Sequence, residues 1–134
     1  MAHVEMSTVV HADANTLWDE IGAFERVGAW HPLLDRVEVE GRRRIAYDKN
    51  GIRHVETLQE SYSRKRRYRY TIDESPMPIR NYTAELRVDD NQDGTSTVRW
   101  SGDFDVADQE RDKTVAIIET FFKAGLTSLR GRHG

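Results

Sequence analysis

Two ionisable residues at positions two apart, His54 and Glu56, are the clearest candidates for chemistry in this sequence. They lie within residues 52–62, where apolar and polar residues alternate as they do in a β-strand. Side chains two apart on a strand point to the same face, so the imidazole and the carboxylate share a face. Such a pair could orient a polar group of a ligand, or could act on it as a general acid or base. We therefore predict that both residues contact a ligand, and both remain candidate catalytic residues.

Aromatic residues gather on one face of the strand-like runs that follow. They are Tyr68, Tyr70, Tyr82 and Trp100. If this face is the inside of a curved sheet, it encloses a mostly apolar pocket with a few polar groups, the usual form of a small-molecule site. The predicted ligand-contacting residues are Trp30, His31, His54, Glu56, Tyr70, Tyr82, Trp100, Phe121 and Phe122.

His31 is expected at the mouth of this pocket. It precedes Pro32, which disfavours helix at the residue before it, so His31 should end a short helix. A helix C-terminus favours the cationic imidazole, which could meet a ligand carboxylate. The alternative is an exposed histidine beside Trp30. His31, His54 and Glu56 could in principle ligate a metal, but they form no compact ligand motif, so we predict no metal and no cofactor.

The elements that would position these residues follow from apolar periodicity and turn residues. Asp13 is a plausible N-cap for the first short helix. The expected strands are 4–10, 36–40, 43–47, 52–62, 67–73, 79–88 and 95–104, with two short helices after the first strand and a single amphipathic helix over 108–130. Sequential hairpins, with turns at 48–51 and 91–94, require an antiparallel sheet. We predict an α+β fold in which a curved sheet of about seven strands wraps around the last helix.

Composition limits the classes of function. With 134 residues, the chain is expected to form a single domain, 1–134, with a real core. Its net charge of −3 argues against nucleic-acid binding, and the basic clusters at 42–44 and 64–67 are expected to be solvated. Cysteine is absent, which excludes disulfides and thiolate chemistry. Residues 1–10 lack a signal-peptide pattern, and no run approaches the roughly 18 apolar residues of a membrane span. A cytoplasmic protein, monomeric or weakly homodimeric, is predicted.

The whole chain resembles the START-like (SRPBCC) helix-grip superfamily, which includes polyketide cyclase/dehydrase-like proteins, lipid-transfer domains and plant hormone-binding proteins. The N-terminal residues that carry the resemblance are Leu17, Trp18, Ile21, Phe24, Trp30, His31 and Pro32. This resemblance implies a cavity between the sheet and the last helix.

A closer similarity exists to the abscisic acid receptor-like branch. Residues 54–58 resemble a strand with a ligand-facing Glu, and residues 80–84 resemble a strand with a ligand-facing Tyr. His31 stands where that branch has a lysine, Met77 stands where it has a latch histidine, and the turn at 48–51 is too short for its gate. The resemblance therefore implies the pocket but neither the gate nor the phosphatase partner.

The leading functional hypothesis is binding of a small hydrophobic ligand with a carboxylate or hydroxyl end. An alternative is a polyketide cyclase/dehydratase-type enzyme that uses Glu56 or His54 as general acid or base without a cofactor. A third hypothesis is a stress-response or chaperone-interaction module in which Tyr68, Tyr70 and phenylalanines fill the cavity. A cavity well below about 300 Å³ would favour this third hypothesis over both others.

Overall fold

The computed structural model describes residues 1–134 and contains a seven-stranded sheet with helices at one end and across one face. The elements are β1 (Ala2–Val10), α1 (Ala14–Ile21), a 3-10 helix η1 (Phe24–Ala29), β2 (Leu34–Glu40), β3 (Arg43–Asp48), β4 (Arg53–Tyr62), β5 (Arg67–Glu74), β6 (Ile79–Asp90), β7 (Ser96–Val106) and α2 (Asp108–Arg132). The expected order of elements is confirmed. Several strands extend one or two residues further than predicted, and α2 ends at residue 132 instead of 130.

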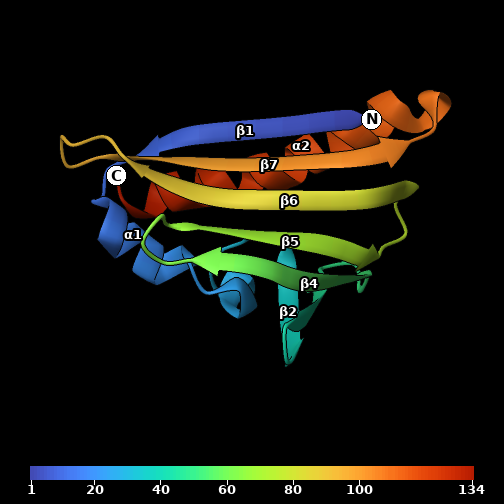
Figure 1. Cartoon of the computed structure of the whole chain (residues 1–134), viewed down its shortest axis with the longest axis horizontal. Helices are drawn as coiled ribbons and strands as arrows, with labels where there is room; N and C mark the ends of the chain where they lie inside the picture. The colour runs from blue at the N-terminus through green and yellow to red at the C-terminus, as the bar shows by residue number, and fades with distance from the viewer.

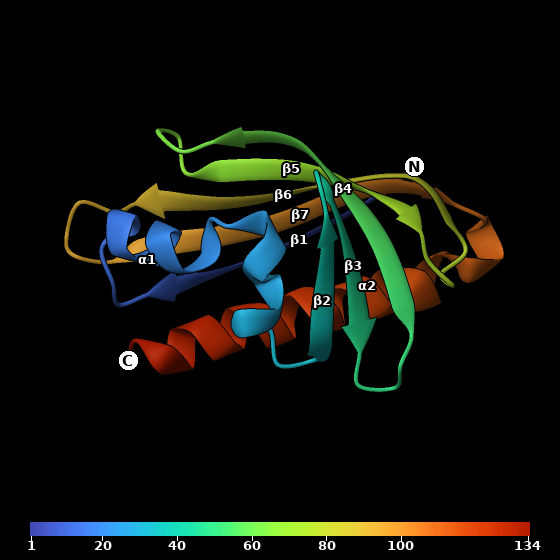
Figure 2. The same cartoon turned by 90° about the horizontal axis from the view of Figure 1, so that it is seen from below.

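The sheet is antiparallel, with strand order β1-β7-β6-β5-β4-β3-β2. Consecutive strands from β2 to β7 are neighbours, whereas β1 pairs with β7. The helices α1 and η1 therefore carry the chain from one edge of the sheet to the other. Figure 2 shows the far edge, β2 and β3, running across the direction of β6 and β7 as the sheet curls.

The curl coincides with irregularities in strand pairing. The register between β4 and β5 shifts after Val55 and again after Leu58, and the register between β6 and β7 shifts after Arg80. A bulge bends its strand and increases the local twist. These bulges help to turn β3 and β4 toward α2, which leaves space between the curved strands and the helix.

The helix α2 lies along one face of the sheet and packs against β1 and β7 (Figure 1). Its buried residues recur at spacings of three and four, as one face of a helix requires; they are Thr114, Ile118, Phe122, Gly125, Leu126 and Leu129. Gly125 permits the closest approach, because a Cβ there would lie 2.7 Å from His31 Cδ2 and 3.0 Å from Trp100 Cζ3.

Side chains fix the start of α1 and the end of α2. Asp13 caps α1 as predicted, and its carboxylate accepts a hydrogen bond from the Thr16 backbone N–H at 2.9 Å. At the end of α2, Arg132 Nη1 donates to Glu20 at 2.8 Å, and His133 Nε2 lies 2.6 Å from the same carboxylate. These contacts tie the last turn of α2 to α1. No helix is both long and apolar enough to cross a membrane.

Candidate functional site

A cavity of about 850 Å³ lies between the curved strands β3–β5, the loop at 75–78 and α2. Its wall is mainly apolar, with Ile72, Met77 and Ile118 among its residues. Small-molecule pockets occupy roughly 300–1,000 Å³, so this cavity is of the size that a ligand needs. The hypothesis of a cavity filled by tyrosine and phenylalanine side chains is therefore wrong.

The cavity wall contains a buried ion pair between Arg44 on β3 and Glu56 on β4. The two residues face each other in the register of the strands, and Arg44 Nε donates to Glu56 Oε1 at 2.6 Å. Arg44 is 1% exposed and Glu56 is 8% exposed. Both residues line the cavity.

The burial of Arg44 corrects the expectation that cluster 42–44 is solvated. Arg42 and Arg43 are exposed, as predicted, but the next residue turns inward. Alternation along β3 places Arg44 on the same face as Ala46, which is also buried. Counting back from the hairpin turn at 48–51 would have placed Arg44 opposite Glu56, whereas the run of arginines suggested only a charged surface.

Aromatic rings and a carbonyl complete the surroundings of the guanidinium. Its central carbon lies 3.8 Å from the centre of the Phe24 ring and 4.8 Å from that of Tyr70. Its Nη1 also donates a hydrogen bond to the Phe24 carbonyl oxygen. Burial by itself lowers the pKa of Arg44, but the charge of Glu56 and the hydrogen bond to it raise that pKa, and the net direction is upward. Arg44 therefore remains a cation.

Two tyrosine hydroxyls contribute neutral polar groups to the cavity wall. Tyr70 accepts a hydrogen bond from Trp100 Nε1 at 3.0 Å, which leaves the tyrosine O–H free to donate. Burial raises the pKa of both Tyr70 and Tyr82, so both remain protonated at neutral pH. Gly102 makes room for Tyr82, because a Cβ there would lie 2.8 Å from the tyrosine oxygen.

His31 does not take the predicted position at the cavity mouth. It is 2% exposed, and its ring stacks on Phe121 with centroids 3.9 Å apart. Its Nδ1 accepts from the Leu33 N–H at 3.2 Å, so Nε2 carries the proton and donates to the Phe121 carbonyl at 2.8 Å. Burial lowers the pKa of His31 to about 4. The expectation of a cationic His31 facing a ligand is therefore wrong, because both ring nitrogens serve the packing of α2.

His54 lines the cavity, but it belongs to a different set of contacts from Glu56. Its Nδ1 lies 3.0 Å from Ser75 Oγ, and its Nε2 lies 3.9 Å from Asp48 Oδ2. The Ser75 oxygen also accepts a hydrogen bond from the Met77 N–H at 3.2 Å. His54 thus joins the turn before β4 to the loop at 75–78, both of which border the cavity.

The structure brings together six of the nine residues predicted to contact a ligand. His54, Glu56, Tyr70, Tyr82, Phe121 and Phe122 line the cavity. Trp30, His31 and Trp100 are buried behind this wall, and Trp100 stacks on Phe122 with ring centroids 4.6 Å apart. Wall residues that the sequence reasoning did not select include Arg44, Ala46, Ile72, Thr114 and Ile118.

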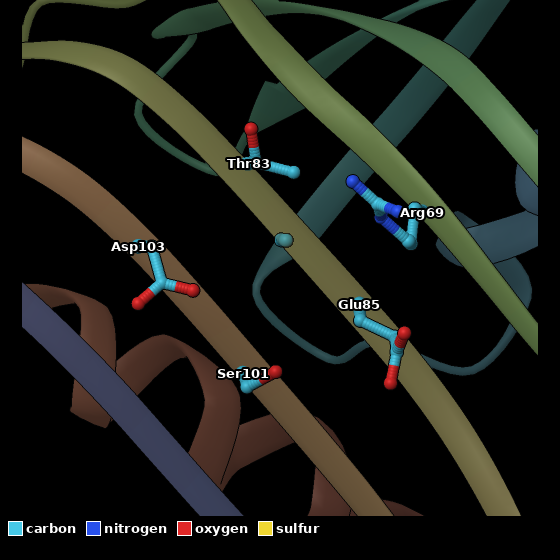
Figure 3. A pocket seen from close by; sticks show the side chains of 6 residues that line it. Arg69, Thr83, Glu85, Ser101 and Asp103 are labelled. Carbon is cyan, nitrogen blue, oxygen red and sulfur yellow. The ribbon is translucent and has the colours of Figure 1, made fainter.

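A second, smaller depression of about 230 Å³ lies on the outer face of the sheet. Figure 3 shows Arg69, Thr83, Glu85, Ser101 and Asp103 projecting there from neighbouring strands. These positions alternate with the inward-facing tyrosines and Trp100, which places them on the opposite face from the cavity. Their side chains are polar, so this depression does not suit an apolar ligand.

The curved antiparallel sheet, the long helix across it and the cavity between them define a START-like fold. In agreement, a START superfamily protein from Mycobacterium smegmatis has a similar structure, with a TM-score of 0.74 at 12% sequence identity, and the match covers 98% of this chain and 96% of that one. The chain belongs to the family described as polyketide cyclase / dehydrase and lipid transport, which its sequence matches over residues 1–134. The predicted resemblance to START-like, polyketide cyclase/dehydrase-like proteins is thereby confirmed.

Two further structures are similar over nearly the whole chain. The protein XoxI from Bacillus cereus has a TM-score of 0.95 at 26% identity, and the match covers 99% of this chain and 96% of that one. The di-domain ARO/CYC protein BexL, from the BE-7585A biosynthetic pathway, has a TM-score of 0.78 at 16% identity, with 98% of this chain and 46% of BexL covered. No curated protein matches the sequence.

Proposed function

We propose that this protein binds a small hydrophobic molecule in the cavity between β3–β5 and α2, with the polar end of the ligand at Arg44 and Glu56. The single observation that carries the proposal is the buried ion pair in the wall of an otherwise largely apolar cavity. Buried charges are expensive to desolvate, and sites that bind small molecules combine apolar walls with a few placed polar groups. Tyr82 supplies a further hydroxyl to the cavity wall.

The apolar wall would provide most of the affinity. Apolar surface removed from water contributes roughly 25 cal/mol per Å² before the costs of association are subtracted. Ile72, Met77 and Ile118 offer such surface from three different elements. The loop at 75–78 and Leu33 border the cavity, and their displacement would admit the ligand.

A cavity-filling substitution tests the proposal. Ala46 is buried on β3 and lines the cavity, so Ala46→Phe should occupy ligand space. Thr83→Phe on the outer face of β6 is the matched control. In a thermal-shift screen of phenols, fatty acids and polycyclic aromatics, we expect at least one of these classes to raise the melting temperature of the wild type in a concentration-dependent way. Ala46→Phe should abolish that rise and Thr83→Phe should retain it. Equal responses of the two variants would place binding outside the cavity and contradict the proposal.

A second candidate function is acid–base catalysis of the cyclase or dehydratase type. The observation that favours it is the carboxylate of Glu56 at the cavity wall, in a chain whose family description includes polyketide cyclases. The pairing with Arg44 keeps Glu56 ionised, and its Oε2, which makes no hydrogen bond to the protein, is the candidate base for a proton on carbon or oxygen. His54 is the alternative acid or base. Glu56→Gln should then abolish turnover of a bound substrate and preserve its binding, whereas a pure binder shows no turnover in either form.

A further inference from the structure

The ion pair at the cavity wall leaves one hydrogen-bonding atom of each residue without a protein partner. Arg44 uses Nε for Glu56 Oε1 and Nη1 for the Phe24 carbonyl. No hydrogen bond of the structure involves Arg44 Nη2 or Glu56 Oε2, and the buried Tyr68 hydroxyl, which lies near Arg44, has no hydrogen-bond partner either. Nη2 is next to Nε on the guanidinium, and Oε2 is next to Oε1 on the carboxylate. Since Nε and Oε1 are joined by a hydrogen bond, Arg44 Nη2 and Glu56 Oε2 lie near each other. The wall therefore offers one N–H donor and one carboxylate acceptor side by side.

The charges at this point cancel. Arg44 is cationic and Glu56 is its carboxylate partner, while Tyr70 and Tyr82 add only neutral hydroxyls. His31, the residue expected to supply a positive charge, is held in its neutral form behind the wall. A ligand carboxylate placed against Arg44 Nη2 would also meet Glu56 Oε2, and two carboxylates in a water-poor site repel each other.

Five other charged or titratable residues line the cavity. They are Asp48 and Lys49 on the turn before β4, and Glu110 and Lys113 on α2, with His54 beside the turn. Lys49 and Lys113 are exposed, so water screens them. Two acidic and two basic residues leave this border without a net charge that would draw in an anion.

We propose that the Arg44–Glu56 pair selects a neutral group that both donates and accepts a hydrogen bond, such as a phenol or an alcohol, and rejects a carboxylate. A hydroxyl oxygen accepts from Arg44 Nη2, and its proton is donated to Glu56 Oε2. The inference rests on the proposed function, since it names the class of ligand for the same cavity.

Three probes of one shape test the selection. The three probes share the naphthalene ring system and differ at one position. 2-Naphthol has a hydroxyl there, 2-naphthoate has a charged carboxylate, and naphthalene has a hydrogen atom. At pH 7 we expect equilibrium dialysis to show 2-naphthol binding roughly 10- to 100-fold more tightly than naphthalene, the range for hydrogen bonds to charged groups. 2-Naphthoate should bind no better than naphthalene. If 2-naphthoate binds as tightly as 2-naphthol, the selection is wrong and the proposed cavity binding stands. If none of the three binds, the proposed function fails as well.

A charge-changing variant supplies an independent reading. Glu56→Gln keeps the size of the side chain and removes its negative charge, so Arg44 becomes available to an anion. We expect 2-naphthoate to bind this variant at least about tenfold more tightly than it binds the wild type, because the repulsion between carboxylates is gone. Glu85→Gln, the same change on the outer face of β6, is the matched control and should leave all three affinities unchanged.

The folding of Glu56→Gln is checked by circular dichroism, and the wild-type series decides the question if this variant does not fold. Unchanged affinity of a folded Glu56→Gln for 2-naphthoate would overturn the proposal. Tight binding of 2-naphthoate to the wild type that is lost in Lys113→Gln would also overturn it, by placing the anion at the cavity border.

Discussion

Removal of one member of the Arg44–Glu56 pair should destabilise the fold far more than removal of both. Arg44 is 1% exposed and Glu56 is 8% exposed, so either residue alone is a nearly buried charge. Breaking a buried pair costs about 3–5 kcal/mol, whereas replacing both partners with apolar residues is often neutral. In Glu56→Leu the guanidinium keeps the Phe24 ring and carbonyl, which reduces the loss. We therefore expect about 3 kcal/mol for this variant.

The assay is urea unfolding of the wild type, Glu56→Leu, Arg44→Met and the double variant, followed by circular dichroism and tryptophan fluorescence. For a chain of this size, a loss of about 3 kcal/mol lowers the melting temperature by roughly 10 °C. The double variant should be more stable than either single variant, which requires a coupling free energy of at least about 3 kcal/mol.

An exposed pair on neighbouring strands provides the control for this cycle. Arg69 Nη1 lies 3.3 Å from Glu60 Oε2, and both side chains are more than two-fifths exposed. Exposed pairs contribute about 0–1 kcal/mol, so the same cycle at Glu60 and Arg69 should give a coupling below about 1 kcal/mol. Losses at Arg44 and Glu56 that simply add in the double variant would refute the reasoning, because additive losses mean that the two charges do not compensate each other.

Two further predictions concern the packing of α2. Because the pKa of His31 is lowered from 6.5 in the unfolded chain to about 4, the unfolded state binds more protons between these values, and stability should fall as pH decreases from about 6.5 to about 4. The loss in the free energy of unfolding is at most about 3 kcal/mol. Urea unfolding at several pH values should show that His31→Gln lacks this part of the pH dependence. If the stability of His31→Gln falls with pH as steeply as that of the wild type, the assignment to His31 is wrong. Gly125→Ala should lower stability by about 1–3 kcal/mol, because the added methyl group meets His31 and Trp100. Gly131→Ala, in the same helix with nothing within 4 Å of its Cβ, should stabilise the protein by up to about 1 kcal/mol; urea unfolding of both glycine variants measures these changes.

The fold was predictable because its signals are local. Asp13 before an apolar periodic segment, Asn-Gly within the turn at 48–51, and alternation along each strand all act within a few residues. These signals determine where elements begin and end, and antiparallel pairing follows from short turns. The inward direction of Glu56, Tyr70 and Tyr82 follows from the same alternation.

Of the two charged residues of the site, only one was predictable from the sequence. Glu56 was selected from its strand, but Arg44 was hidden by the two exposed arginines that precede it. Its burial depends on pairing with Glu56 and on the ring of Phe24, a residue 20 positions away. The prediction of a cationic His31 was wrong for a related reason. Its neutral state results from stacking on Phe121, 90 positions later, and from the space that Gly125 leaves. Such long-range packing has no local signature.

The pairing of β1 with β7 has a consequence for how the chain reaches this structure. Ala2 pairs with Phe104 and Val10 with Ser96. Every residue of the first strand therefore stays unpaired until a segment far along the chain has been synthesised. Pairings between distant segments slow folding, because the intervening loop must close, at a cost in entropy, before any contact can stabilise the closed form. The hairpins from β2 to β6 can form as the chain emerges from the ribosome. The first strand can dock only when the seventh is available, and this late docking creates the face on which α2 packs.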